Sequence, residues 1–67
     1  MSEDPLKNRE IIFEFFQIGA YVKVTAMDVA TLTEASISGP KGTSDAIMKH
    51  NAMKRLEYTM RKKGLIA

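Results

Sequence analysis

Between Glu10 and Ile37, apolar side chains recur at every second position, and the pattern is broken twice by short turn-like segments. Alternation with a period of two is typical of β-strands, whose successive side chains point to opposite faces. The pattern predicts strands over residues 10–18, 21–27 and 32–38. Gly19 and Ala20 join the first two strands, and a two-residue loop that begins with glycine favours a type II′ hairpin turn.

The two predicted loops each imply a pairing register. The first pairs Ile18 with Tyr21, and the second, over residues 28–31, pairs Met27 with Leu32. Both registers place the same apolar set on one face, whereas a slip of one residue would move that set to the opposite face. The predicted core face comprises Ile11, Phe13, Phe15, Val22, Val24, Ala26, Ala35 and Ile37.

The opposite face should alternate to polar residues if it is solvated, but the first strand remains apolar there too. Contiguous apolar patches on small proteins commonly mark interfaces. We therefore expect a protein interface, most simply with a second copy of the chain. Two alternatives stay open: the N-terminal arm or the tail residues 65–66 cover the patch, or association runs edge to edge, for which the third strand offers an open edge. The expected interface residues are Ile12, Phe16, Ile18 and Tyr21.

A helix is expected over residues 44–63, after the strand-breaking segment 39–42. Thr43 or Ser44 provides an N-cap, and Gly64 suits the C′ position of a Schellman ending. One helical stripe gathers the apolar side chains that would pack on the sheet, namely Ala46, Met48, Ala52, Met53, Leu56, Thr59 and Met60. The predicted fold is α+β: a three-stranded antiparallel β-meander followed by one C-terminal α-helix packed on one face, in the order β-β-β-α.

The chain has 67 residues and no cysteine, so we expect a single small domain over residues 10–67 after a disordered lead-in over residues 1–9. A core of this size rarely stabilises a fold by more than roughly 3–5 kcal/mol, and association is the usual supplement. No apolar run reaches the roughly 20 residues of a membrane span. Acidic residues stand where a signal peptide has a basic start. We therefore expect a cytoplasmic protein without a membrane partner.

The net charge of +2 is unevenly distributed, because the helix is basic and the sheet slightly acidic. Cations one helical turn apart beside an aromatic ring favour nucleic-acid binding as an alternative function. A solvated helix face, with lysines placed favourably near the helix C-terminus, explains the same pattern. The residues of this alternative site are Lys54, Arg55, Tyr58, Arg61 and Lys62.

Catalytic groups are scarce in the sequence. His50 has no carboxylate among its helical neighbours, and Glu14 and Glu34 are expected near one another across the second strand but without a pocket. The loop over residues 39–44 lacks the glycine spacing of a phosphate loop, and Asp45 would repel an anion there. We expect a protein that is not an enzyme and has no cofactor, metal or small-molecule substrate.

Three antiparallel strands followed by a helix are similar in outline to integrase-type and related plant DNA-binding domains. Those domains use arginine and tryptophan on the outer sheet face, whereas Lys23 is the one cation there in this chain. The segments IIFEFFQIGAYVKVTAMD, TEASISGP and KRLEY resemble a family of small bacterial proteins of unknown function, over about residues 10–60. This resemblance implies a β-β-β-α domain without assigned catalytic residues. The expected function is that of a self-associating interaction module, most simply a homodimer, with a nucleic-acid-binding accessory protein as the alternative.

Overall fold

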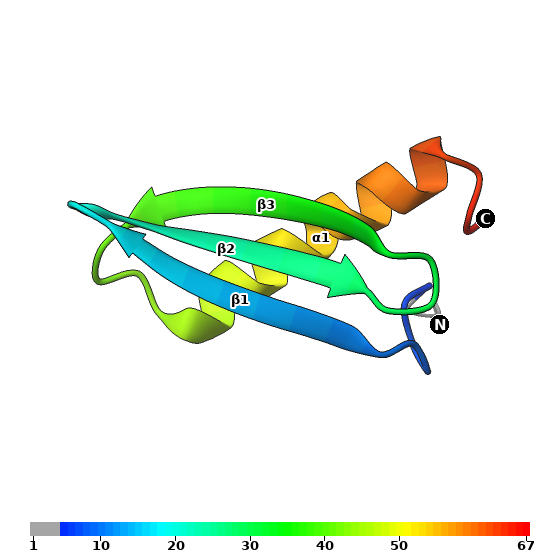
Figure 1. Cartoon of the computed structure of the whole chain (residues 1–67), viewed down its shortest axis with the longest axis horizontal. Helices are drawn as coiled ribbons and strands as arrows, with labels where there is room; N and C mark the ends of the chain where they lie inside the picture. Colours follow the sequence, from blue (N-terminus) through cyan, green and yellow to red (C-terminus); the bar gives the residue numbers. More distant parts are fainter. Residues whose placement is uncertain (1–4) are drawn as a thin grey trace.

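A computed structural model describes residues 5–67 of the chain. The elements are β1 (Ile11–Ile18), β2 (Tyr21–Asp28), β3 (Thr33–Pro40) and α1 (Asp45–Lys62). The strands form one antiparallel sheet in the order β1-β2-β3, and α1 crosses one of its faces (Figure 1). The predicted α+β meander with a C-terminal helix is confirmed. No helix among the described residues is both long enough and apolar enough to cross a lipid bilayer.

The first hairpin has the predicted register. Ile18 pairs with Tyr21, and Phe15 pairs with Val24. Gly19 has a φ of 59°, a conformation that costs glycine little because it has no Cβ. Its place at the first position of a two-residue loop matches the twist of the flanking strands, as the type II′ turn requires.

The second hairpin differs from the prediction by one residue. The predicted pairing of Met27 with Leu32 is wrong, because β2 continues to Asp28, which pairs with Thr33. The loop keeps its four residues but lies one position further along the chain. The partners in β3 therefore shift by two residues, and a shift of two leaves every side chain on its predicted face.

Asp28 explains the position of this loop. Its side chain is fully buried, and its Oδ2 accepts hydrogen bonds from the Thr31 hydroxyl at 2.7 Å, the Thr31 backbone N–H at 3.1 Å and the Arg9 guanidinium at 3.1 Å. Leu32 closes the loop with a φ of 58°, and its N–H donates to the Asp28 carbonyl at 2.8 Å. The hydrogen bond from the Thr31 hydroxyl contributes most to lowering the pKa of the Asp28 carboxyl below its ordinary value. Burial of the carboxyl acts in the opposite direction.

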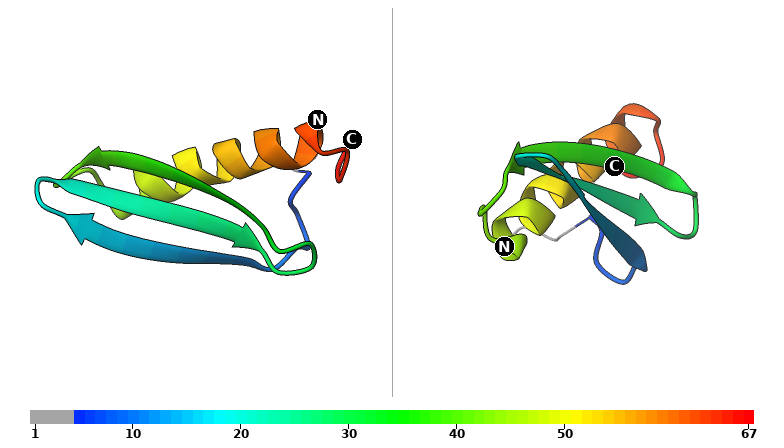
Figure 2. Two further views of the ribbon diagram at one scale, coloured as in Figure 1. Left: turned by 45° about the horizontal axis from the view of Figure 1, so that its top comes forward. Right: turned by 60° about the vertical axis from the view of Figure 1, so that its left-hand side comes forward.

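The core lies between α1 and the part of the sheet formed by β2 and β3 (Figure 2). Most of the predicted helix stripe is confirmed, since Met48, Ala52, Leu56 and Met60 are buried, whereas Ala46 is exposed. From the sheet and the preceding segment, the buried apolar residues are Leu6, Val24, Ala26 and Ala35.

The expected disordered lead-in covers residues 1–9, of which residues 1–4 lie outside the described part of the chain. Leu6 is 4% exposed and belongs to the core. Arg9 pairs with Asp28 through a guanidinium-to-carboxylate distance of 3.1 Å. The folded unit therefore includes chain that precedes β1.

Both ends of α1 carry the predicted caps. The Ser44 side chain accepts the Ile47 backbone N–H at 3.2 Å. Gly64 has a φ of 76°, and the N–H of Leu65 donates to the Met60 carbonyl at 2.9 Å. This bond closes a Schellman motif and satisfies a carbonyl at the helix end.

We predict that Asp28→Asn lowers the free energy of unfolding by about 1–3 kcal/mol, because a neutral amide loses the charge-assisted bonds of Oδ2. The amide also places a donor where Oδ1 has no partner among the described residues. Urea denaturation followed by circular dichroism measures the change. Glu34→Gln removes an exposed carboxylate from β3 and is the matched control. Equal stability of both variants and the wild type would contradict this role of Asp28.

The lowered pKa of Asp28 also predicts a pH dependence of stability. A carboxyl group whose pKa is lower in the folded than in the unfolded chain stabilises the fold above the unfolded value of about 3.9. That contribution is lost as the pH falls from about 5 through the folded pKa. The wild type should therefore lose more stability than Asp28→Asn over this acidic range, and parallel pH profiles would show that another group is responsible.

Candidate interaction surface

The position of α1 leaves one strand of the sheet largely uncovered. The helix packs mainly against β3 and then β2, whereas β1 lies at the sheet edge away from it (Figure 2). A helix with its side chains is about 10–12 Å wide, and neighbouring strands lie about 4.8 Å apart. One helix therefore covers about two strands of this sheet.

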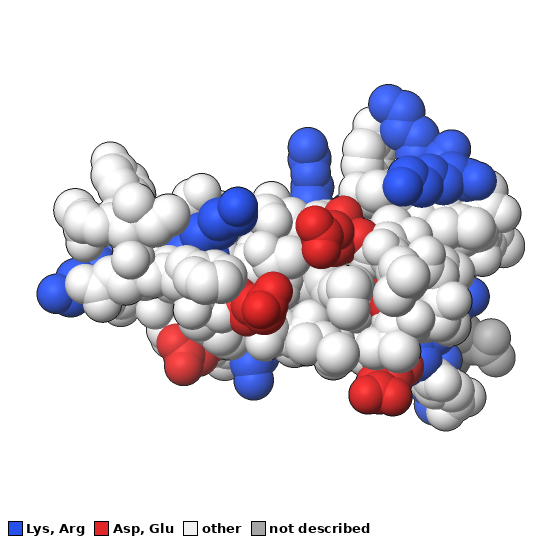
Figure 3. Space-filling model, in the orientation of Figure 1, with Lys and Arg blue, Asp and Glu red and all other residues white. Residues whose placement is uncertain are grey.

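The predicted interface residues lie together on the sheet face opposite α1. The register places Ile18 beside Tyr21, and Phe16 follows two positions along β1 on the same face. Figure 3 views this face, which is largely uncharged over the β1–β2 hairpin with a few scattered charged groups. The exposed fractions of the four side chains are 43% for Ile12, 52% for Phe16, 62% for Ile18 and 60% for Tyr21. The structure thus brings Phe16, Ile18 and Tyr21 into one exposed apolar patch, whereas Glu14 separates Ile12 from them on the same face of β1.

The described termini do not cover this patch. Leu6 belongs to the core cluster, and Ile66 packs against that same cluster, so the described residues at both ends lie on the helix side of the sheet. Leu65 is 40% exposed. Coverage by the tail residues 65–66, one of the alternatives raised by the sequence, is therefore not what the structure shows.

The helix-side face of β1 is also partly open. Phe15 was expected in the core, but it is 39% exposed because α1 passes over β2 and β3 instead. Phe13 is half-buried, and the Lys49 ammonium lies 5.5 Å from the centre of its ring. Sequence reasoning missed this second open face, although the width of one helix relative to three strands was sufficient to indicate it.

The expected juxtaposition of Glu14 and Glu34 does not form. Glu14 pairs with Thr25, and the residue on the far side of Thr25 is Ser36, because of the shifted β3 register. The hydroxyls of Thr25 and Ser36 lie 2.8 Å apart. Glu34 instead pairs with Met27. The carboxylates of Glu14 and Glu34 are therefore separated from each other on the outer face of the sheet.

The basic helix face of the alternative function is exposed throughout, at Lys54, Arg55, Tyr58, Arg61 and Lys62. The cationic groups of Arg55 and Lys62 each lie 5.7 Å from the centre of the Tyr58 ring. Arg61 donates to the Glu57 carboxylate at 3.1 Å and to the Ala67 carbonyl at 3.0 Å. Two of the cations therefore lie close to the aromatic ring, and a third, Arg61, is engaged within the chain.

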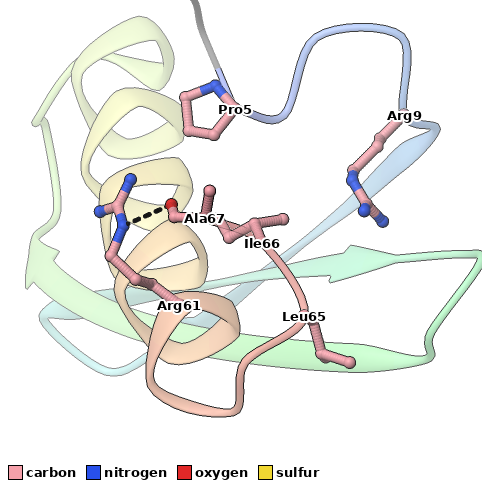
Figure 4. A pocket seen from close by; sticks show the side chains of 6 residues that line it. All are labelled: Pro5, Arg9, Arg61, Leu65, Ile66 and Ala67. Carbon is pink, nitrogen blue, oxygen red and sulfur yellow. Dashed lines mark hydrogen bonds between the residues drawn. The ribbon is translucent and has the colours of Figure 1, made fainter.

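An open hollow of about 430 Å³ lies between the N-terminal segment and the C-terminal tail (Figure 4). Its two charged side chains are Arg9, which pairs with Asp28, and Arg61, which pairs with Glu57. No group of three or more histidine, aspartate or glutamate side chains suited to a metal ion occurs within residues 5–67. The hollow is lined by Pro5, Arg9, Arg61, Leu65, Ile66 and Ala67.

Comparison with curated proteins found no match, and comparison with solved structures found none either. One family model, described as a domain of unknown function (DUF6898), matches residues 8–63. The resemblance to a family without an assigned function is therefore confirmed. Because the match extends over most of the chain, from the lead-in to the end of α1, the chain belongs to the DUF6898 family of domains of unknown function.

Proposed function

We propose that this domain is a non-catalytic protein-interaction module that self-associates through the free face of its sheet. The observation that carries the proposal is the exposed apolar patch of Phe16, Ile18 and Tyr21, with Ile12 further along the same face, which the described termini leave open. Contiguous apolar surface of this kind on a small protein typically belongs to an interface. The proposal includes the cytoplasmic location that the sequence analysis expects.

The composition of the core supports the need for a partner. Of the eight buried apolar residues within residues 5–67, three are alanines, at positions 26, 35 and 52. Full burial of a large apolar side chain stabilises a protein by about 1.5–3 kcal/mol, whereas alanine has little side chain to bury. A second copy on the free face would remove several large side chains from water, and we expect the fold to gain stability from association.

We predict that Phe16→Glu converts a dimer to a monomer, because it places a carboxylate in the centre of the apolar patch. Light scattering on a sizing column, over a wide range of loading concentrations, measures the mass. Phe16→Leu keeps the position apolar and should retain the dimer. Circular dichroism should show the same helix content in both variants, since Phe16 is not a core residue.

Two outcomes contradict the proposal. One is a wild-type mass that stays monomeric at every concentration. The other is a wild-type dimer that persists unchanged in the Phe16→Glu variant.

A second candidate function is nucleic-acid binding through the basic helix face, and the arrangement around Tyr58 favours it. An exposed aromatic ring with two cations near it suits the stacking of a base beside contacts to the phosphate backbone. Binding of this kind weakens steeply as the salt concentration rises, because protein cations release counterions from the phosphates.

We predict that the double variant Lys54→Glu, Lys62→Glu weakens binding to a labelled single-stranded oligonucleotide at least tenfold at low salt, measured by fluorescence anisotropy. The two lysines are substituted in place of Arg61 because Arg61 forms an ion pair with Glu57, and its loss would change the helix surface as well as the charge. The matched control is Lys23→Glu, Lys41→Glu, which makes the same charge change on the sheet and its following loop. Absence of wild-type binding to single-stranded and duplex DNA at low salt would eliminate this candidate.

A further inference from the structure

We infer that the second copy pairs along the free edge of β1, so that two three-stranded sheets join into one continuous six-stranded antiparallel sheet. This inference rests on the proposed self-association but places the contact along the edge of β1 and not on the free sheet face, so the outer apolar side chains stay on the surface of the joined sheet. It differs from a face-to-face sandwich of the two outer sheet faces, which would leave both β1 edges open.

The composition of β1 is that of a strand covered on both faces. Its sequence IIFEFFQI is apolar on the outer face and on the helix side, as is typical of a strand with both faces covered. Yet β1 lies at the edge and pairs with β2 alone among the described strands. Edge strands of soluble proteins are commonly protected by lysine, proline or a covering element. β1 has no lysine or proline, whereas the opposite edge strand, β3, ends at Pro40 and lies under α1.

The hydrogen-bonding groups at this edge can be assigned from the register. A two-residue hairpin makes Ile18 and Tyr21 a hydrogen-bonded pair, and such pairs alternate along the strand. The bond from the Val29 N–H to the Glu10 carbonyl, at 3.1 Å, continues this alternation. Even-numbered residues of β1 therefore bond to β2, and the backbone groups of Phe13, Phe15 and the other odd-numbered residues point to the open edge.

Charge selects among the two-fold registers that this edge allows. A register centred on Glu14 would set that carboxylate against its own copy, and like charges directly opposite destabilise a sheet. A register centred on Phe15 sets Glu14 opposite the partner's Phe16, and Phe16 pairs with Lys23 on β2. The Glu14 carboxylate of one copy then lies near Lys23 of the other copy, with the Phe16 side chain of that other copy between them. The charges therefore favour the register in which Phe15 meets the partner's Phe15.

Edge pairing also accounts for the open helix-side face. It places both α1 helices on the same side of the six-stranded sheet, with Phe13 and Phe15 of each copy in the groove between them. Phe15, which is 39% exposed in the single chain, is then covered by its counterpart. A face-to-face sandwich leaves Phe15 in water and buries Tyr21 instead. These two residues consequently distinguish the two geometries.

Cysteine cross-linking tests this geometry directly, because the chain has no native cysteine. Facing residues of a hydrogen-bonded antiparallel pair have Cα atoms about 5.5 Å apart, inside the roughly 4.4–6.8 Å range of disulfides. Phe15→Cys should therefore form a covalent dimer under mild oxidation. Tyr21→Cys is the matched control, since strand β2 lies three strand spacings, about 14 Å, from its copy. Cross-linking of Tyr21→Cys in place of Phe15→Cys would overturn edge pairing and support the sandwich.

A backbone variant gives a second readout that leaves the apolar side chains intact. Gln17 is exposed, and its N–H points to the open edge. Gln17→Pro removes this N–H donor, and the two-fold symmetry means that the dimer loses one hydrogen bond from each copy. The dissociation constant of the dimer should therefore rise about tenfold or more. Gln17→Thr keeps the N–H and should dimerise like the wild type. Light scattering over a concentration series measures both variants.

The outcomes separate the two proposals. A wild-type monomer at all concentrations overturns edge pairing and self-association together. A wild-type dimer that Phe16→Glu dissociates and Gln17→Pro leaves unchanged overturns edge pairing alone. Dissociation by Gln17→Pro, together with the Phe15→Cys cross-link, establishes the continuous sheet and shows that the dimer does not form through the free sheet face.

Discussion

The width of the single helix limits how much of the sheet can be buried. α1 packs on β3 and β2, and the apolar side chains of those strands form the core with Met48, Leu56 and Met60. β1 lies beyond the reach of this cover. Its side chains are apolar on both faces, and those of Phe15 and Phe16 remain exposed on opposite sides. The exposure of Phe15 follows from this difference in width between one helix and three strands.

The buried carboxylate of Asp28 connects parts of the chain that the helix does not hold together. It closes the β2–β3 loop through Thr31 and fastens the segment before β1 through Arg9. Leu6, carried by that segment, fills the end of the core. The Asp28 side chain thus sets the register of β3 and brings residues 5–9 into the fold. The addition of Leu6 matters because this small core has few large side chains.

The two candidate surfaces lie on different sides of the molecule. The apolar patch occupies the outer sheet face and the β1 edge, whereas the basic residues around Tyr58 lie on exposed positions of α1. The proposed self-association and the proposed nucleic-acid binding would therefore not compete for the same residues. Edge pairing would set two α1 helices on one side of a single sheet, so that the basic faces of both copies would be presented to the same partner.

Local chemistry in the sequence determined the elements of this protein. The period-two pattern specified the strands, Gly19 the first turn, and Ser44 and Gly64 the ends of the helix, because each of these depends on residues close in the chain. The prediction also found the exposed patch around Phe16, since the faces survive a register shift of two residues.

Tertiary structure alone decided the β2–β3 register, the inclusion of Leu6 and the exposure of Phe15. The register depends on the burial of Asp28, which holds the loop through Thr31. The inclusion of Leu6 depends on the contact of Asp28 with Arg9, whose positions are 19 residues apart. The third depends on which strands the helix crosses. Contacts between distant residues and the placement of one element over another are not encoded in any local pattern of side chains.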